Sequence, residues 1–391
     1  MSDLIVELLA RRPPAADREP VRIHTLLELL DRPDRAVPAV WVGGAHGKSS
    51  VATMVAALFA ALDITAGAAT SPHLQDVRER MRIAGEAIGA DELRAGLHYI
   101  EPFLREVDAR FPSPLSFDEA LHAMAATWFA DAPVDVAVFE GTPDATDRRE
   151  VTVTMGGDET TVTGGDAQAR MLGGDFGPDD RRVAVGGQQL TLRGTTGAVT
   201  NVYLPLHGAH QAANAATALA VVEAFLGYST ALDEELIRRA FASVRLPGRL
   251  EVVRRTDAAS VLLDGARDVV SAGALLAALR SEFTVRNRVG VVGLVGGDPG
   301  PVMQVLTAAL DHVVVVPAPT PDSPPTGEVA AAVQRAGTAV EVADTIPAAL
   351  EFASGVATAE DAVVVTGGLQ TVGAARRVLG LTPADDLLQT K

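Results

Sequence analysis

Cysteine is absent from the 391-residue sequence, and no apolar run approaches the roughly 18 residues that a membrane span needs. The absence of cysteine excludes disulfide bonds, thiolate metal sites and a cysteine nucleophile, and it is typical of a reducing compartment. The apolar run near the N-terminus is short and lies between acidic residues, unlike the core of a signal peptide. We therefore expect a cytoplasmic protein with no membrane partner.

Basic and aromatic residues are also scarce. The 33 Lys and Arg residues are outnumbered by 50 Asp and Glu residues, which gives a formal net charge of −17. This balance argues against nucleic acid as a partner, because binding to a phosphate backbone depends on a clustered basic surface. Aromatic residues make up 4% of the chain and hydrophobic residues 48%, so the cores must be built from Ala, Val and Leu. The length predicts two to three domains of about 150 residues each.

Residues 40–54 carry the clearest functional motif. An apolar run that ends at Val42 predicts a strand, the glycine-rich residues 43–47 predict a turn, and the apolar periodicity from Ser49 onward predicts a helix. The backbone N–H groups of such a turn, together with the helix dipole, favour a bound phosphate group. Lys48 would then neutralise phosphate charge, and Ser49 would be placed to hold Mg²⁺.

The spacing of this motif is shorter than that of the general P-loop, which has four residues between the first glycine and Gly-Lys. A plain strand-to-helix turn is therefore the alternative interpretation. Lys48 and Lys391 are the only lysines in the sequence, whereas every other basic residue is arginine. A compact ammonium group reaches between phosphates better than a planar guanidinium, which favours phosphate binding over chance in an arginine-biased composition.

A second candidate site residue follows a buried strand. Residues 134–139 alternate too little for a half-exposed strand and predict a central parallel strand, with Glu140 at its C-terminal end. Ligands gather at that edge of an open α/β sheet, so Glu140 is a candidate Mg²⁺ ligand, and a helix cap or a solvated charge is the alternative. Helices are predicted over 91–106 and 116–129, and the second begins with a capping box at Ser116 and Glu119.

The sequence pattern divides the chain into three parts. Residues 1–22 hold one short helical pattern and a proline-rich segment, which predicts a loosely docked N-terminal arm. Residues 23–247 form a central domain, in which the Gly- and Thr-rich segment 151–200 predicts a small antiparallel sheet and helices follow over 215–226 and 233–243. Residues 248–391 alternate strand and helix, which predicts a second domain with a doubly wound parallel sheet.

Several motifs occur in an order that one family shares. They are the glycine-rich loop at 43–50, Ser-Pro-His at 71–73, Arg-Glu-Arg-Met-Arg-Ile at 78–83, the strand at 133–140, His-Gln-Ala-Ala-Asn at 210–214, Pro-Gly-Arg at 247–249 and Leu-Asp-Gly-Ala at 263–266. Over most of residues 20–382 the sequence resembles the dihydrofolate synthase/folylpolyglutamate synthase family of Mur-type ligases. The resemblance implies an α/β fold with a P-loop Mur-ligase-like central domain on a doubly wound parallel sheet and a C-terminal Rossmann-like α/β domain.

The resemblance also implies an activity. In an ATP-dependent ligase of this family, ATP phosphorylates a folate-like carboxylate, and the amine of glutamate attacks the acyl phosphate to form an amide. ATP and Mg²⁺ are the implied cofactors, and we expect a monomer. Mapped by motif, the expected catalytic residues are Lys48, Glu140 and Arg267, and the expected metal ligands are Ser49, Ser71 and Glu140. The expected nucleotide-binding residues are Gly44, Ala45, His46, Gly47, Lys48, Ser49, Ser50, Asn214, Arg249 and Asp264, and the expected substrate-binding residues are Ser71, Pro72, His73 and Arg82.

The sequence departs from this family at the second metal. In the family, the acid after the central strand opens a glycine-rich loop, and a histidine and a carbamylated lysine that serve a second metal follow. Here the loop at 140–147 is shortened, no histidine lies between His122 and His207, and no lysine lies between Lys48 and Lys391. Arginine cannot replace these ligands, because its guanidinium stays protonated and does not carbamylate.

Two further interpretations therefore stay open beside a folate ligase. One is a catalytically degenerate paralogue that binds nucleotide or folate and acts as a regulatory or partner protein, and the other is a ligase for a non-folate acid in specialised metabolism. Arg267 stands where the family's motif has a neutral histidine. Losing a metal should cost several kcal/mol of transition-state stabilisation, so we expect weak or absent folylpolyglutamate synthase turnover unless acids such as Asp158 or Glu159 replace the ligands.

Overall fold

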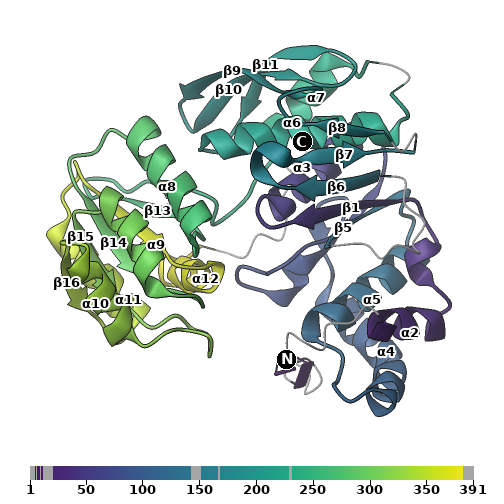
Figure 1. Ribbon diagram of the computed structural model, residues 1–391, viewed down its shortest axis with the longest axis horizontal. Coiled ribbons are helices and arrows are strands. Elements are labelled where there is room, and N and C mark those ends of the chain that lie inside the picture. Colours follow the sequence, from purple (N-terminus) through teal and green to yellow (C-terminus); the bar gives the residue numbers. More distant parts are fainter. Residues whose placement is uncertain are drawn as a thin grey trace.

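The computed structural model describes residues 5, 7, 8, 10, 11, 21–141, 151–165, 168–228 and 231–381, without the side chain of residue 158. The described part forms two α/β bodies that lie side by side (Figure 1). The P-loop body, the described residues up to 243, contains an eight-stranded sheet and a three-stranded sheet. The C-terminal body, residues 251–381, contains a six-stranded sheet, and residues 244–250 connect the two bodies.

The eight-stranded sheet consists of β1 (Ala39–Gly44), β2 (Ala66–Ala69), β3 (Met81–Ile83), β4 (Glu86–Ala87), β5 (Val136–Glu140), β6 (Val151–Met155), β7 (Thr161–Thr163) and β8 (Ala169–Met171). Its strand order is β4-β3-β2-β5-β1-β6-β7-β8. The central strands β2, β5, β1 and β6 are parallel, and antiparallel strands stand at both edges. The predicted central strand before Glu140 is confirmed, and Glu140 is its last residue.

Helices cover both faces of this sheet, as the apolar character of its strands requires. Along β1, Val40 and Val42 face one buried core and Ala39 and Trp41 face another, because successive side chains of a strand point to opposite faces. The first core is completed by α3 (Lys48–Ala61), α6 (Ala209–Phe225) and α7 (Glu234–Ser243). The second is completed by α2 (Val21–Leu29), α4 (Ala90–Arg110) and α5 (Phe117–Asp131).

The start of α5 and the described N-terminal residues show how these elements are held. Ser116 Oγ accepts a hydrogen bond from Glu119 N (3.2 Å), and the Glu119 carboxylate accepts one from Ser116 N (2.7 Å), so the predicted capping box is confirmed.

Ile5 and Leu8 are buried in the core that α2, α4 and α5 complete. At these two positions the N-terminal segment is packed, and the prediction of a loosely docked arm is wrong for them.

The segment 151–200 differs from its prediction at β6. We expected residues 151–155 in a small antiparallel sheet, but β6 pairs in parallel with β1 and extends the main sheet. Its alternation of buried Val151 and Val153 with more exposed threonines marks a strand covered on one face, and that pattern is the same in parallel and antiparallel pairing. The predicted antiparallel sheet does exist further along, as β9 (Gly177–Ala184), β10 (Gly187–Arg193) and β11 (Ala198–Leu204).

Two helices begin earlier than the apolar pattern predicted. α3 begins at Lys48, with Gly47 at its N-cap, and β1 runs on to Gly44, so the predicted turn at 43–47 is shorter. α6 begins at Ala209 instead of residue 215, which places the motif at 210–214 in the first turns of the helix. Polar side chains that face a cavity interrupt an apolar pattern without interrupting the helix, and this is why periodicity missed the start of α6.

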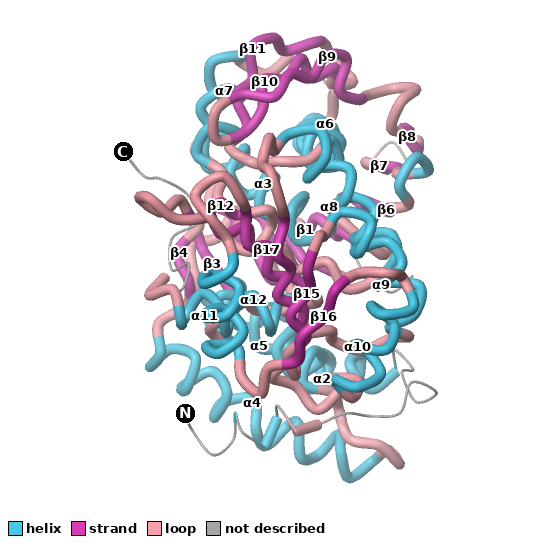
Figure 2. Tube along the Cα trace, turned by 90° about the vertical axis from the view of Figure 1, so that its left-hand side faces the viewer, coloured by secondary structure: helices cyan, strands magenta, loops and turns pink. Residues whose placement is uncertain are grey.

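The C-terminal body confirms the predicted doubly wound sheet. Its strands are β12 (Glu251–Val253), β13 (Ser260–Leu263), β14 (Arg288–Val292), β15 (His312–Val315), β16 (Ala339–Val342) and β17 (Ala362–Thr366). The order is β12-β13-β17-β14-β15-β16, and every pair is parallel except β12 with β13. Figure 2 shows β12, β17, β15 and β16 following one another across this sheet.

The helices of this body pack on both faces of its sheet. α8 (Val269–Glu282), α9 (Pro299–Leu306) and α10 (Thr326–Arg335) contribute to one core, and α11 (Ile346–Val356) and α12 (Leu369–Val378) contribute to the other. None of the described helices is long and apolar enough to cross a membrane.

Candidate active site

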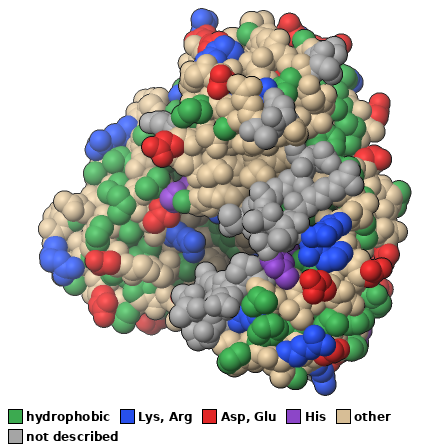
Figure 3. All heavy atoms as spheres, turned by 45° about the vertical axis from the view of Figure 1, so that its right-hand side comes forward, with side chains coloured by type: hydrophobic (Ala, Val, Ile, Leu, Met, Phe, Trp, Pro, Cys, Tyr) green, Lys and Arg blue, Asp and Glu red, His purple; other side chains and the backbone are tan. Residues whose placement is uncertain are grey.

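A cavity of about 420 Å³ lies between the two bodies. Its walls come from the loop between β1 and α3, the C-terminal end of β5, the first turns of α6, and residues 264–275 of the C-terminal body. Figure 3 shows a hollow between the two bodies whose rim carries acidic, basic and histidine side chains. The C-terminal ends of parallel strands in both sheets therefore face one shared space, which is where ligands bind in open α/β sheets.

The glycine-rich loop has the close packing that phosphate-binding loops need. Gly47 has a φ of +83°, and a Cβ atom there would lie 2.7 Å from Asn214 Oδ1 and 2.9 Å from Met155 Cε. Only glycine fits that conformation in that space without strain. Lys48 Nζ donates to the carbonyl oxygens of Gly44 (2.9 Å) and Ala45 (3.3 Å) at the N-terminus of α3. The ammonium group is thus held beside backbone N–H groups that favour an anion.

Glu140 lies at the centre of a compact oxygen-rich cluster. Its Oε2 accepts hydrogen bonds from Ser49 Oγ (2.8 Å) and Ser71 N (2.9 Å), and Lys48 Nζ lies 3.8 Å from its Oε1. Burial raises the pKa of Glu140 above its ordinary value, while the bonds from Ser71 and Ser49 and the charges of Lys48 and Arg249 oppose that rise. A buried carboxylate whose ionised form is disfavoured by desolvation gains most from a nearby cation.

The donor set of this cluster fits Mg²⁺. The carboxylate of Glu140 and the hydroxyl of Ser49 supply oxygen ligands, and Ser49 Oγ also lies 3.1 Å from Ser71 O. Mg²⁺ takes oxygen ligands and is usually bound by one or two carboxylates, waters and substrate phosphates instead of a full protein cage. Within the described residues, no group of three or more His, Cys, Asp or Glu side chains is placed to hold a metal ion by itself.

The opposite wall of the cavity carries a half-buried carboxyl group, Asp264, and a half-buried guanidinium, Arg249. Asp264 accepts hydrogen bonds from Leu250 N (2.9 Å) and Ala266 N (2.9 Å). Burial raises the pKa of Asp264 to about 6, although Arg249 and these two N–H groups favour its charged form. Burial also lowers the pKa of Arg249, and Asp264 and Glu140 oppose that shift. Arg267 lines the cavity and is exposed.

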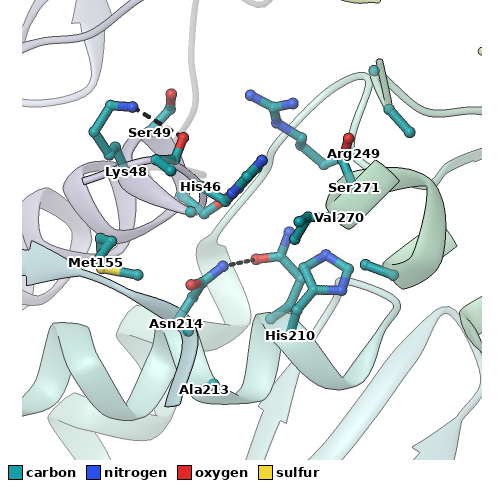
Figure 4. Close-up of a pocket in the computed structure, with 18 of the residues that line it drawn as sticks. His46, Lys48, Ser49, Met155, His210, Ala213, Asn214, Arg249, Val270 and Ser271 are labelled. Carbon is teal, nitrogen blue, oxygen red and sulfur yellow. Dashed lines mark hydrogen bonds between the residues drawn. The ribbon is translucent and has the colours of Figure 1, made fainter. Parts of the chain in front are cut away.

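The first turns of α6 place three polar side chains in the cavity, of which the sequence singled out only Asn214. Asn214 Nδ2 donates to Gln211 Oε1 (3.1 Å), and both side chains are buried (Figure 4). Burial and the charge of Arg249 lower the pKa of His210 to about 4, so its imidazole is neutral near neutral pH. His210 and Gln211 lie within the same His-Gln-Ala-Ala-Asn motif, and a helical reading of that motif places them near Asn214.

His46 joins the two walls. Its Nε2 lies 3.0 Å from Asp268 Oδ2, and Asp268 also caps α8 by accepting a hydrogen bond from Ser271 N (2.9 Å). Both side chains are about 44% exposed. Figure 4 shows His46 between the helix that carries Lys48 and the helix that carries Ser271. The glycine-rich loop is therefore hydrogen-bonded directly to the C-terminal body.

Most of the site residues expected from the sequence line this cavity, but three do not. Gly44 contributes only its carbonyl group to Lys48. Arg82 is buried on β3 and donates to Gly85 O (2.9 Å). His73 Nδ1 accepts a hydrogen bond from Arg80 Nε (3.0 Å), and burial and the charge of Arg80 lower its pKa to about 4. The cavity residues expected from the sequence are Ala45, His46, Gly47, Lys48, Ser49, Ser50, Ser71, Pro72, Glu140, Asn214, Arg249, Asp264 and Arg267.

The segment after β5 also contributes to the cavity, which the sequence did not predict. Met155, Thr160 and Leu172 line the wall near Asn214. They lie in or directly beside the strands that extend the sheet beyond β1, and the parallel pairing of β6 with β1 brings this segment to the cavity. Of the two acids considered as replacement ligands, Glu159 is exposed, and the side chain of Asp158 and the loop at 142–150 lie outside the described residues.

Comparisons with known proteins agree with this arrangement. The family model described as "Mur ligase, glutamate ligase domain" matches residues 248–369. A dihydrofolate synthase/folylpolyglutamate synthase of Mycobacterium tuberculosis is 34% identical over an alignment of 459 residues, which covers 97% of this chain and 94% of the relative. A probable bifunctional folylpolyglutamate synthase/dihydropteroate synthase of Haloferax volcanii is 32% identical over 404 residues, covering 90% of this chain and 47% of that protein.

A solved structure agrees as well. The folylpolyglutamate synthase of Mycobacterium tuberculosis complexed with ADP and AMPPCP matches with a TM-score of 0.87 and 33% identity, over 97% of this chain and 98% of that one. The fold class expected from the sequence is thereby confirmed.

Proposed function

Because the chain belongs to the dihydrofolate synthase/folylpolyglutamate synthase family, we propose that it is an ATP-dependent ligase that joins glutamate to a folate-like carboxylate. The observation that carries the proposal is the cavity in which Lys48, Glu140 and Asn214 of one body face Asp264 of the other body and Arg249 of the connecting segment. Two relatives named for this activity are more than 30% identical over at least nine-tenths of the chain. One matching structure contains ADP and AMPPCP.

The reaction proceeds in two balanced steps. An oxygen of the acceptor carboxylate attacks the terminal phosphorus of ATP, the bond to the bridging oxygen breaks, and ADP leaves. The amine nitrogen of glutamate then attacks the acyl carbon, phosphate leaves with the bonding electrons, and the nitrogen loses a proton to form the amide. Neither step needs a nucleophile from the protein, so positioning and charge neutralisation supply the catalysis.

The glycine-rich loop is proposed to hold the phosphates of ATP. Ala45, His46, Gly47 and Ser50 form the loop and the first turn of α3 around the chain's one lysine in the described region, Lys48. The ammonium of Lys48 would exchange its two backbone carbonyl contacts for phosphate oxygens. The carbonyl contacts hold the ammonium at the helix N-terminus before nucleotide binds, which reduces the entropy lost on binding.

Mg²⁺ is proposed to bind at Glu140, Ser49 and Ser71. Bound there, it would neutralise charge on the phosphates during transfer. The protein's own contribution is to hold the Glu140 carboxylate toward the phosphate loop through the hydrogen bonds from Ser49 Oγ and Ser71 N.

The remaining cavity residues are proposed to hold the nucleoside and the second substrate. Asn214, Arg249 and Asp264 contact the nucleotide, and Arg267 supplies a positive charge near the reacting groups. Ser71 and Pro72 face the acceptor acid at the edge of the cavity. His73 and Arg82 stay proposed substrate contacts, although both are engaged by Arg80 or by backbone in the present structure.

The proposal also covers the second metal, the domain division, and the location and oligomeric state of the protein. We propose that the second metal of the family has incomplete ligands here, because the chain holds no lysine or histidine in the relevant interval. We also propose the division into an N-terminal arm (1–22), a central ATP-binding domain (23–247) and a C-terminal ligase domain (248–391), in a cytoplasmic monomer. The connecting segment 244–250, which lies between the elements of the two bodies, supports that division.

The decisive experiment measures ADP release with ATP, Mg²⁺, glutamate and either dihydropteroate or tetrahydrofolate. Native protein is compared with Lys48→Ala and with Arg280→Ala. Arg280 lies on α8, does not line the cavity, and donates a hydrogen bond to Ala308 O (2.8 Å). We expect turnover in native protein and Arg280→Ala, slowed by the incomplete ligands of the second metal, and its loss in Lys48→Ala. No other lysine of the described chain can neutralise the phosphates.

Two other outcomes would redirect the assignment. ATP binding without turnover, across varied acids and amines, would support a nucleotide-binding paralogue that acts on a partner protein, as the missing second-metal ligands suggest. Turnover with a non-folate acid alone would place the ligase in another pathway. Failure to bind ATP at all would contradict every form of the proposal.

A further inference from the structure

The loop that carries Ser71 has a second side, which faces away from the cavity. Ser71 and Pro72 line the cavity, and Ser71 N donates to Glu140. Three residues later, the backbone of Leu74 lies against α12 of the C-terminal body. A Cβ atom at Gly373 of α12 would lie 1.8 Å from Leu74 O. The helix and the loop can therefore approach this closely only because residue 373 is glycine.

Gln75 fixes the loop to the C-terminal body. Its side chain is buried, with Nε2 donating to Leu381 O (3.1 Å) and Oε1 accepting from Arg376 Nε (2.8 Å). Its carbonyl oxygen accepts a hydrogen bond from Arg377 Nη2 (2.6 Å). The side-chain amide and the backbone carbonyl of one residue are thus both satisfied by groups of the other body.

The same loop is also fixed to its own body. The carboxylate of Glu79 accepts hydrogen bonds from the backbone N–H groups of Leu74 (2.7 Å), Gln75 (3.1 Å) and Asp76 (3.0 Å). Glu79 is buried. With three N–H groups held on one side and α12 on the other, the loop cannot shift without breaking contacts with one body.

α12 reaches the opposite wall of the cavity as well. Arg376 forms an ion pair with Glu251 Oε1, and Glu251 Oε2 accepts a hydrogen bond from Gly248 N (2.9 Å). Gly248 has a φ of +73° and directly precedes Arg249, which lines the cavity. One buried guanidinium therefore links the loop of Ser71 to the turn of Arg249.

We propose that α12 is a positioning element for the reaction. Gly373 and Arg376 of α12, together with Gln75 of the loop, set the distance between the Ser71–Glu140 cluster and Arg249. This inference rests on the proposed function and extends it, because none of the three residues lines the cavity. They act through Ser71 and Arg249, so they are positioning residues. Misplacing a binding group by about 1 Å costs on the order of 100-fold in rate, which gives such a device a measurable effect.

The test inserts one methyl group at Gly373. Gly373→Ala pushes against Leu74 O, whereas the control Gly355→Ala adds a methyl group on α11 with no atom within 4 Å. Gln75→Ala is the second variant, because it removes the amide contacts without adding a clash. Each variant is characterised by its melting temperature, by hydrogen–deuterium exchange of residues 70–76, and by the Mg²⁺ dependence of ADP binding in calorimetry.

We expect Gly373→Ala and Gln75→Ala to speed exchange in residues 70–76 and to raise the Mg²⁺ concentration needed for half-maximal ADP binding about 10-fold, with Gly355→Ala like native protein. In the ligase assay we expect kcat to fall more than the KM for ATP rises. These binding and exchange readouts do not require turnover, so they separate this inference from the ligase proposal. Unchanged Mg²⁺ dependence in both variants, whatever their melting temperatures, would overturn it.

Discussion

At the scale of single residues, the shape of the site depends on positions where an added methyl group would displace neighbouring side chains. Gly47 is the clearest case, since it combines a left-handed backbone conformation with close contacts to Asn214 and Met155. Asn214 comes from α6 and Met155 from β6, so three elements meet at one glycine. The shape of the phosphate loop is therefore determined by packing from outside the loop.

We expect Gly47→Ala to weaken ADP binding strongly. The left-handed conformation costs a non-glycine residue about 1–2 kcal/mol, and the methyl group must also displace Asn214 Oδ1. Isothermal titration with ADP and Mg²⁺ measures the effect. The matched control is Gly173→Ala, which has a similar φ of +86° but no atom within 4 Å of the new methyl group. Equal ADP affinity in the two variants would contradict this account.

We expect the stability of the nucleotide-free protein to depend on Asp264 in acid. Burial raises the pKa of this carboxyl from 3.8 to about 6, so between pH 4 and 6 the folded protein holds a proton that the unfolded chain releases. The free energy of unfolding contributed by this group therefore falls as pH rises through that window, by at most about 3 kcal/mol. Asp264→Asn removes this contribution.

The measurement for Asp264 is the melting temperature of both proteins from pH 4 to pH 7. Relative to native protein, Asp264→Asn should become more stable as pH rises and reach a plateau above about pH 6. A difference between the two melting temperatures that does not vary with pH would show that the carboxyl has an ordinary pKa.

The sequence identified Lys48 and Glu140 because each follows directly from a local pattern, a glycine-rich turn and the end of a buried strand. It did not identify His210 or Gln211 as cavity residues, although both lie in a motif that it named. The raised pKa of Asp264 also had no sequence signal, because it depends on burial between two bodies. A local sequence pattern can identify a candidate residue. The pKa of that residue depends on groups that the fold brings around it, which a local pattern does not contain.

At the scale of elements, the orientation of α6 decides what the cavity contains. The N-terminus of α6 is held by Glu282, the last residue of α8, whose buried carboxylate accepts a hydrogen bond from Gly208 N (2.9 Å). The same carboxylate pairs with Arg181 of β9 and with His207 Nδ1 (3.0 Å). Burial alone would raise the pKa of Glu282, but the bond from His207 and the charge of Arg181 lower it below its ordinary value.

We expect Glu282→Gln to destabilise the protein by about 3 kcal/mol, because it leaves the charge of Arg181 without its buried partner. ADP affinity should fall as well, since His210 and Asn214 sit in the first turns of α6. Urea unfolding and ADP titration measure the two effects. The control is Glu360→Gln, whose pair with Arg286 is highly exposed and should contribute little. Native stability in Glu282→Gln would refute this expectation.

The sequence predicted strands and helices correctly where their signal is local. It failed where the result depends on which strand a segment pairs with. The parallel strands of the C-terminal sheet and the capped start of α5 were predicted because their signals are local. The pairing of β6 with β1 was not, because a half-buried alternating strand has the same pattern in both directions. That one pairing brings Met155 and Leu172 to the cavity.

At the scale of the whole molecule, the cavity is shared between two bodies that each have their own cores. The contacts that join them, such as Arg376 with Gln75 and Glu282 with Gly208, connect residues that are far apart in the chain. No periodicity predicts such contacts, so the arrangement of the two bodies could be known only from the structure.

We expect ADP with Mg²⁺ to stabilise both bodies together. A ligand that binds only the folded, assembled cavity adds about 2.7 kcal/mol at a free concentration 100 times its Kd. Differential scanning calorimetry should therefore show a higher melting temperature and a single transition with ADP. The shift should be lost in Lys48→Ala. A shift confined to one of two separate transitions would mean that the nucleotide contacts one body only.

The hydrogen bond between His46 and Asp268 has a kinetic consequence. It crosses from the phosphate loop to the start of α8, and both side chains are partly exposed, so it lies near the rim of the cavity. We expect a bound nucleotide to leave faster when the pair is open, because the pair ties the phosphate loop to the C-terminal body. The lifetime of one contact between a loop and a helix cap would then limit the residence time of ADP, and through it the rate at which the next ATP can enter.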